Sequence, residues 1–136
     1  MSEHITLADR VEIAELFARL ARILDERRPE DVRTVYAEDV VVRSPRGELH
    51  GADAVIAFLQ RSQVDGEHTQ HLHSDALVSV EGDRVRASAN QLVHYFRDGQ
   101  APHRRSGLRL SYTVVRTPAG WRFREGSLTL AWAQPG

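Results

Sequence analysis

The chain contains no lysine and no cysteine, so all 18 of its basic residues are arginines. Without lysine, the protein cannot form a Schiff base, use a phosphate-loop lysine or rely on a lysine general base. Without cysteine, it has no disulfide, no thiolate nucleophile and no thiolate metal ligand. Carboxylates, histidines and hydroxyls are therefore the groups on which its chemistry can depend.

Long apolar runs and a strong net charge are also missing. The N-terminus has neither the basic nor the apolar segment of a signal peptide, and no apolar run reaches membrane-spanning length. We therefore expect a soluble, cytoplasmic protein with no membrane partner. A net charge of -1 argues against a nucleic-acid partner. With 136 residues, 41% of them hydrophobic, residues 1–136 should form one domain with a core or a small cavity.

Helix signals come first along the chain, and strand signals follow. Thr6 as N-cap, with Asp9 three residues later, predicts a helix that runs to about Arg27. The other predicted elements are a short helix at 30–36, a short strand at 40–43, a helix at 52–61, and strands at 71–81, 84–96, 108–116 and 121–132. This order predicts an α+β fold, with helices packed on one face of a curved sheet.

Two of the predicted strands are separated only by a turn at 82–83 and therefore form an antiparallel hairpin. Counting outward from the turn places Asp75 opposite Asn90 and His71 opposite His94. Side chains that face each other in this way lie roughly 5 Å apart. An ordinary hairpin would have valine or threonine at these positions, so the polar cluster is the strongest functional signal in the sequence.

The same register conflicts with the apolar pattern of the hairpin. If the pairing is strictly regular, the apolar residues of both strands share one face and the two histidines lie on the other. β-Bulges near 74–75 and 90–91 would reverse the alternation, and strongly curved sheets require such bulges, so we expect them. Otherwise the histidines are satisfied polar residues on the outer face, at a subunit interface.

The first helix carries an acidic residue on its apolar side. At about 100° per residue, Asp25 shares a face with one apolar group, and a second apolar arc lies beside it. The face contains Leu7, Val11, Ala14, Ala18 and Ala21, and the neighbouring arc contains Ile13, Phe17, Leu20 and Leu24. Asp25 should therefore point inward as a general acid or base, unless it bonds to Arg22 or Arg28 at the helix end.

A histidine cluster also raises the question of a metal. His68, His71, His73 and His94 could offer nitrogen ligands to zinc. Their spacing matches no metal motif, and no acidic ligand accompanies them at a recognisable distance. We expect no metal site.

The order of several short sequence patterns carries a family resemblance. The patterns are ARLARILD at 18–25, VYAEDVVV at 35–42, GADAV at 51–55, TQHL at 69–72 leading into VEGD at 80–83, and VR at 115–116 before GWR at 120–122. In this order they resemble the SnoaL-like group of the nuclear transport factor 2-like superfamily. The resemblance implies a conical α+β barrel, in which three N-terminal helices pack on a strongly curved, mixed, mostly antiparallel sheet around a deep apolar pocket.

The resemblance also implies a kind of chemistry. Relatives of this group include scytalone dehydratase, bile-acid dehydratases, polyketide cyclases, steroid isomerases and epoxide hydrolases, which share acid/base chemistry without a cofactor. A dehydratase, cyclase or isomerase acting on an apolar polycyclic, polyketide or terpenoid-like molecule is therefore expected, with no cofactor. Where the dehydratases carry a tyrosine one helical turn before the aspartate, this chain has Leu20, so Tyr36 or Tyr112 would have to supply the hydroxyl.

Three residues match the pocket-facing catalytic groups of the dehydratase-like members. Asp25 and His71 would form a general acid/base pair in which one orients the other, and His94 would polarise or donate to a substrate oxygen. Candidate substrate-binding residues are Phe17, Leu20, Tyr36, Phe58, Asn90, Tyr112 and Trp132. The alternative is a non-catalytic module of the same fold that holds an apolar ligand or dimerises. We also expect a homodimer formed through the outer sheet face.

Overall fold

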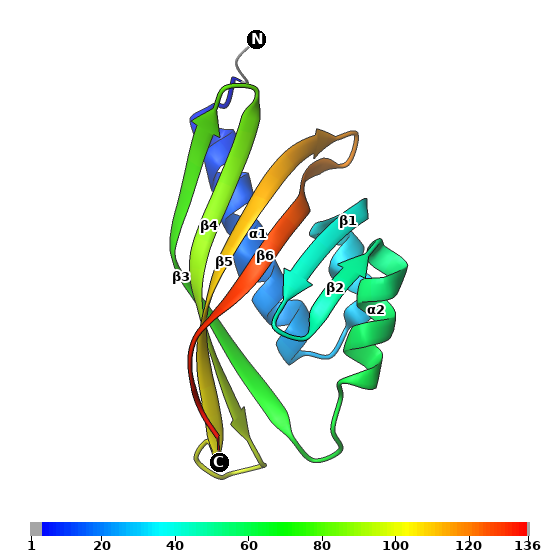
Figure 1. The fold of residues 1–136 in the computed structure, drawn as a ribbon, viewed down its shortest axis with the longest axis vertical. Helices are drawn as coiled ribbons and strands as arrows, with labels where there is room; N and C mark the ends of the chain where they lie inside the picture. Colours follow the sequence, from blue (N-terminus) through cyan, green and yellow to red (C-terminus); the bar gives the residue numbers. More distant parts are fainter. Residues whose placement is uncertain (1–3, 136) are drawn as a thin grey trace.

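Residues 4–135, which the computed structural model describes, form two α-helices and a 3-10 helix on a curved six-stranded sheet (Figure 1). The elements are α1 (Leu7–Asp25), η1 (Pro29–Thr34), β1 (Tyr36–Ser44), β2 (Gly47–His50), α2 (Ala52–Arg61), β3 (His68–Glu81), β4 (Arg84–Phe96), β5 (Arg104–Thr117) and β6 (Gly120–Gln134). The strand order is β2-β1-β6-β5-β4-β3, with β1 and β6 parallel and the other neighbours antiparallel. The predicted mixed, mostly antiparallel α+β fold is confirmed.

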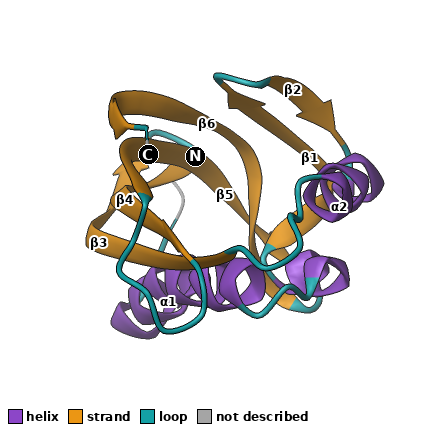
Figure 2. Ribbon diagram, turned by 90° about the horizontal axis from the view of Figure 1, so that it is seen from below, coloured by secondary structure: helices purple, strands orange, loops and turns teal. Residues whose placement is uncertain are grey.

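The sheet curls around an interior that the helices close (Figure 2). Helix α1 packs mainly along β3, and α2 packs against η1 and β1. The long strands β3 to β6 bend together, and α2 stands beside the short β1–β2 pair. None of the helices in residues 4–135 is long and apolar enough to cross a membrane.

Helix α1 begins as predicted and buries only part of the predicted apolar surface. Thr6 and Asp9 form the expected capping box, in which each side chain accepts from the other residue's backbone nitrogen. The helix stops at Asp25, before Arg27 adopts a left-handed φ of 54°. Leu7 and Val11 are 79% and 52% exposed, so their predicted inward position is wrong, whereas Ala21 and the neighbouring arc of Ile13, Phe17 and Leu20 are buried. The buried side chains are Ile13, Leu16, Phe17, Leu20, Ala21 and Ile23, mostly large ones that remove more apolar area from water than alanines do.

The predicted bounds of the other elements agree with the structure to different degrees. The helix at 52–61 matches α2 residue for residue, and the hairpin strands lengthen only at the start of β3. The short helix after Pro29 is a 3-10 helix, and β1 starts at Tyr36, four residues earlier than predicted. Strand β2 was not predicted, because its four residues have no apolar alternation and one side of it is an edge of the sheet.

One β-bulge interrupts the β3–β4 hairpin. Asp75 and Ala76 both lie opposite Ala89, so β3 carries one residue more than β4 at this point. Asp75 has a left-handed φ of 56°, which aspartate tolerates better than most residues, and Asn90 donates to its carboxylate at 3.1 Å. The bulge predicted near 74–75 is confirmed. The bulge predicted near 90–91 is wrong, because β4 pairs with β5 without interruption.

The single bulge changes which residues face each other. His71 pairs with Val93 and His94 pairs with Gln70, so the predicted pairing of His71 with His94 is wrong. A bulge in only one strand shifts the register by one residue and turns the preceding part of that strand over. His71 consequently lies on the concave face with Gln91 and Val93, while His94 lies on the outer face.

An aromatic cluster fills the core between α1 and the strands β5 and β6. The ring of Tyr112 is fully buried and stacks on Phe123 with centroids 4.1 Å apart and planes inclined by 13°. Phe17 of α1 packs on Phe123 at 4.9 Å. Gly126 lies directly beneath Tyr112, and a Cβ atom there would overlap the tyrosine ring. Only glycine at this position lets the aromatic stack sit flat on the sheet.

Candidate active site

The end of α1 and the start of β3 bring Asp25 and His71 together. His71 Nδ1 lies 2.7 Å from Asp25 Oδ1, and the backbone nitrogen of His71 donates to Oδ2 at 2.9 Å. Thr69 Oγ1 donates to Oδ1 at 3.0 Å. The side chains of Asp25 and His71 are only 23% and 12% exposed. The carboxylate is therefore fixed by three groups of β3, and it holds the imidazole in one orientation.

The hydrogen bonds decide which nitrogen of His71 is free for chemistry. A carboxylate can only accept, so the proton of the neutral ring is on Nδ1 and the lone pair is on Nε2. No described residue within 4–135 bonds to Nε2, and His71 lines a cavity. This is the arrangement of a general base that a carboxylate orients and whose protonated form the carboxylate would stabilise. The alternative partners of Asp25 are not used, because Arg28 pairs with Glu26 and Asp31 instead.

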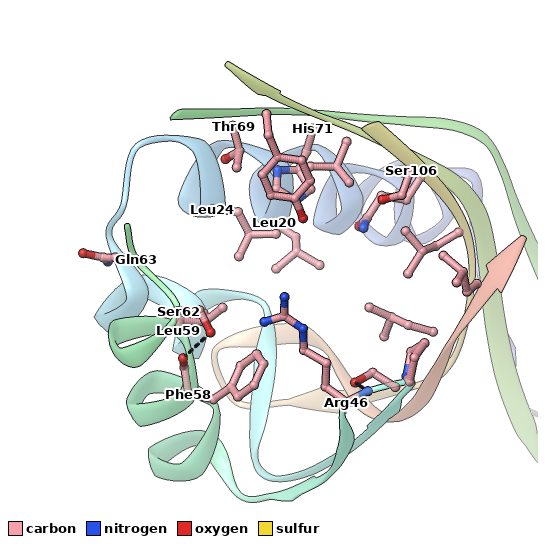
Figure 3. Close-up of a pocket in the computed structure, with 18 of the residues that line it drawn as sticks. Leu20, Leu24, Arg46, Phe58, Leu59, Ser62, Gln63, Thr69, His71 and Ser106 are labelled. Carbon is pink, nitrogen blue, oxygen red and sulfur yellow. Dashed lines mark hydrogen bonds between the residues drawn. The ribbon is translucent and has the colours of Figure 1, made fainter. Parts of the chain in front are cut away.

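The cavity beside this pair has a volume of about 800 Å³ and lies between the helices and the concave face of the sheet (Figure 3). Of the predicted binding residues, Leu20, Tyr36 and Phe58 line it. Its other apolar walls come from Ile23, Leu24, Val42, Leu49, Val55, Leu59, Val93, Leu108, Leu128 and Leu130. The arrangement is a mostly apolar chamber with a base in its wall.

The remaining predicted binding residues lie outside the cavity wall. Phe17 and Tyr112 belong to the buried core behind it, and Asn90 is on the surface with Asp75. Trp132 is 45% exposed and covers Gly107 on the outer face of the sheet. A bulge in β6 between Leu130 and Trp132 shifts the register, so that Trp132 pairs with Gly107. His94 does not line the cavity either, for the register reason given above, and we leave it out of the site.

Comparison with known proteins fits this geometry. The family model of the SnoaL-like domain matches residues 6–126. The chain belongs to the SnoaL-like domain family. No protein of curated function matches this SnoaL-like chain.

Solved structures agree with the assignment. An NTF2-like protein with a cystatin-like fold from Novosphingobium aromaticivorans is 30% identical over 92% of this chain and 83% of its own, with a TM-score of 0.77. Kfla4162 from Kribbella flavida is 24% identical over 93% of both chains, with a TM-score of 0.81. ActVI-ORFA from Streptomyces coelicolor is 19% identical over 89% of this chain and 96% of its own, with a TM-score of 0.79. The latter two likenesses concern the fold alone.

Two tyrosine hydroxyls meet at the inner end of the SnoaL-like cavity. Tyr36 lines the cavity, and its hydroxyl lies 3.1 Å from that of Tyr112. Burial raises the pKa of Tyr36 to about 12, and burial also raises the pKa of Tyr112 well above its ordinary value. Both groups therefore keep their protons, yet their mutual bond uses only one of the two. When Tyr112 donates to Tyr36, the proton of Tyr36 is available to a molecule in the cavity.

The sequence did not single out Gln91 and considered His73 only as a zinc ligand, yet the SnoaL-like domain places both beside His71. His73 Nδ1 lies 2.7 Å from the carbonyl oxygen of Phe17, and Nε2 lies 2.8 Å from Gln91 Oε1. Burial lowers the pKa of His73, so its ring is neutral, donates to Phe17 and accepts at Nε2. Because an amide oxygen cannot donate to Nε2, we assign the Gln91 amide the flipped orientation, in which its NH₂ group bonds to the ring and its oxygen is left for the cavity that Gln91 lines.

A signal for these two residues was present in the hairpin. His73 follows His71 by two positions and therefore shares its face, and Gln91 lies directly opposite His73. Gln91 is only 6% exposed. Within the described part of the chain, no three His, Asp or Glu side chains are placed to hold a metal ion.

Proposed function

We propose that this SnoaL-like protein is a cofactor-independent acid/base enzyme of the dehydratase, cyclase or isomerase type. The observation that carries the proposal is the Asp25/His71 pair, which presents an unbonded Nε2 at the wall of an apolar cavity. Membership of the SnoaL-like family supports the general class, because the group includes enzymes of this kind.

The proton path runs through His71. Its Nε2 accepts a proton from a carbon or hydroxyl of the substrate, and the electron pair released moves into the substrate. The imidazolium formed is stabilised by the Asp25 carboxylate at 2.7 Å, which stays ionised. The same nitrogen returns the proton to a departing hydroxyl in an elimination, or to another carbon or oxygen in an isomerisation or ring closure. No external acid, base or oxidant is consumed.

Negative charge that develops on a substrate oxygen needs a donor. The available proton of Tyr36 serves this purpose, and Tyr112 supports it by donating to the Tyr36 oxygen. In the flipped orientation that we assign to its amide, the carbonyl oxygen of Gln91 can accept from a substrate hydroxyl on the His71 side of the cavity. These two groups orient the substrate between donor and base.

The apolar walls favour a largely hydrocarbon substrate. Pockets for molecules of drug size have volumes of roughly 300–1,000 Å³, so the cavity of about 800 Å³ suits a polycyclic, polyketide or terpenoid-like molecule. A water-poor chamber of this kind also protects reactive enol intermediates from side reactions.

The proposal is tested by proton exchange, which requires only the first half of the reaction. A panel of polycyclic ketones is incubated with the protein in D₂O, and deuterium uptake next to the carbonyl is followed by NMR. Wild type should catalyse exchange, and His71→Gln and Asp25→Asn should each lower it by roughly 10²-fold or more. His50→Gln is the matched control, since His50 lies on β2 and its ring pairs with Glu48 at 3.2 Å, away from the cavity lining.

The outcome separates the enzyme from the binding module. If both variants of the pair exchange protons as fast as wild type, the assigned chemistry is wrong. If no ketone exchanges, and a ligand that co-purifies is released chemically unaltered after long incubation, the protein is a carrier of the same fold.

We also propose that two copies pair through the outer sheet face. Leu72, Leu92, Gly107 and Trp132 follow one another across the four long strands, and the three larger side chains are 48%, 39% and 45% exposed. An apolar row of this kind is self-complementary in a two-fold dimer. Light scattering should report a dimer for wild type and a monomer for Leu92→Arg, and a monomeric wild type contradicts the proposal.

A further inference from the structure

Arg46 is an unpaired cation at the cavity. It lies in the tight turn between β1 and β2, where its backbone nitrogen donates to Ser44 Oγ at 3.2 Å. Its guanidinium extends into the cavity (Figure 3) and lies over the Phe58 ring, 5.9 Å from the centroid. Its side chain forms no hydrogen bond or ion pair with any residue between 4 and 135. The charge faces a chamber with mostly apolar walls.

Two other arginines at the cavity, Arg27 and Arg104, differ, because they donate hydrogen bonds within the protein. Arg27 donates to the backbone oxygen of Glu67. Arg104 donates to the Glu67 carboxylate at 3.4 Å and lies 3.8 Å over the Tyr95 ring. The same carboxylate bonds to His103 at 2.7 Å and is 13% exposed. The Glu67 carboxylate, which lines the cavity, is thus held by its own partners.

The balance of charge around the opening is therefore positive. Arg105 also lines the cavity and has no ionic partner in the described residues, which adds to the positive potential that Arg46 creates. The negative charges of Asp25 and Glu67 do not cancel it, because four arginines line the cavity: Arg27, Arg46, Arg104 and Arg105. A chamber with an apolar interior and an unpaired guanidinium is complementary to an amphipathic anion.

We infer that the substrate is an apolar molecule that carries a carboxylate, and that Arg46 is the residue that binds this group. A guanidinium presents two parallel N–H donors that match the two oxygens of a carboxylate, and the contact with Phe58 holds its plane. The inference deepens the proposed function: with the carboxylate at Arg46, the apolar body fills the chamber and directs its far end to His71.

The binding test uses two fluorescent probes that differ only in charge. Pyrenebutyrate carries the carboxylate, and its primary amide is a neutral molecule of the same shape. Wild type should bind the carboxylate at least about tenfold more tightly than the amide, because a hydrogen bond to a charged group is worth more than a neutral one. Arg46→Gln should lose this preference and bind the amide as wild type does.

Arg43→Gln is the matched control, because it removes the same charge from the same hairpin. Arg43 pairs with Glu48 and Glu125 and does not line the cavity, so the preference for the carboxylate should persist in this variant. Equal affinity of wild type for the two probes, an unchanged preference in Arg46→Gln, or no binding of either probe overturns the inference. Neither probe can undergo elimination, so these results are independent of the proton-exchange test of His71.

Discussion

Asp25→Asn is the most informative single change, because asparagine has the shape of aspartate but the opposite hydrogen-bonding character on one atom. In the wild-type protein the backbone nitrogen of His71 lies 2.9 Å from Asp25 Oδ2. An asparagine whose oxygen takes the Oδ2 position still accepts this hydrogen bond. Its NH₂ group then occupies the Oδ1 position, 2.7 Å from His71 Nδ1, and can only donate. The imidazole proton must therefore move to Nε2, so the base becomes a donor.

From the structure we can estimate how much Asp25→Asn should lower the stability of the fold and the rate of proton exchange. Charge-assisted hydrogen bonds from Thr69 and His71 become neutral ones, which should lower the free energy of unfolding by about 2 kcal/mol in total. For a domain of this size, that corresponds to a fall in Tm of about 8 °C. Proton exchange should fall much further, by roughly 10²–10⁴-fold, because the unprotonated Nε2 is absent from the main tautomer.

Nitrogen NMR of protein labelled in its histidines reads the tautomer directly, without a substrate. The two ring nitrogens of His71 are assigned by comparison with His71→Gln. Wild type should show a protonated Nδ1 and an unprotonated Nε2, and Asp25→Asn should show the reverse. A wild-type ring protonated on Nε2, or the same tautomer in both proteins, refutes the role given to Asp25.

Three other predictions concern packing, pH and register. Gly126→Ala should lower the free energy of unfolding by about 1–3 kcal/mol, because the new methyl group overlaps the Tyr112 ring. Urea titration measures this change, and an unchanged midpoint would mean that the aromatic stack can shift without loss of stability. His73 has its pKa lowered from 6.5 by burial, so the unfolded chain binds the proton first. Stability should therefore be complete above about pH 6.5 and fall below it, and the slope should be smaller in His73→Gln; equal slopes would contradict the burial of a neutral ring. His94→Gln should exchange protons at the wild-type rate, since His94 faces outward, and a large loss would restore it to the site.

Elements with strong local signals could be predicted from the sequence. The capping box of α1, helix α2 and the hairpin turn depend on neighbouring residues, and each is present. The buried face of α1 could not be read from angular position alone, because both apolar arcs fit a helix period. Contact with the sheet selects the arc with the larger side chains, such as Leu16 and Ile23.

The site was only partly predictable, because the partner of each residue in a long hairpin depends on the number of residues between it and the turn. Asp25 and His71 were expected near each other, and they are 2.7 Å apart. His94 was expected with them, but the extra residue at Asp75 moves every pair beyond it by one position. The resulting partner of Gln91 is His73, whereas a strict register places Ser74 opposite Gln91.

The bulge in β3 makes the chemistry of the cavity depend on chain length as well as on side chains. A chain lacking one residue between Ser74 and Leu77 could pair in an unbroken ladder while keeping every residue that the site uses. His71 would still lie opposite Val93 on the concave face, because Ser74 already pairs with Asn90 and Leu77 with Ser88. The full-length chain paired without a bulge would instead turn Leu72 to the chamber and His71 to solvent. In engineering terms, the bulge can be removed from this strand without loss of the base only when its extra residue is deleted with it.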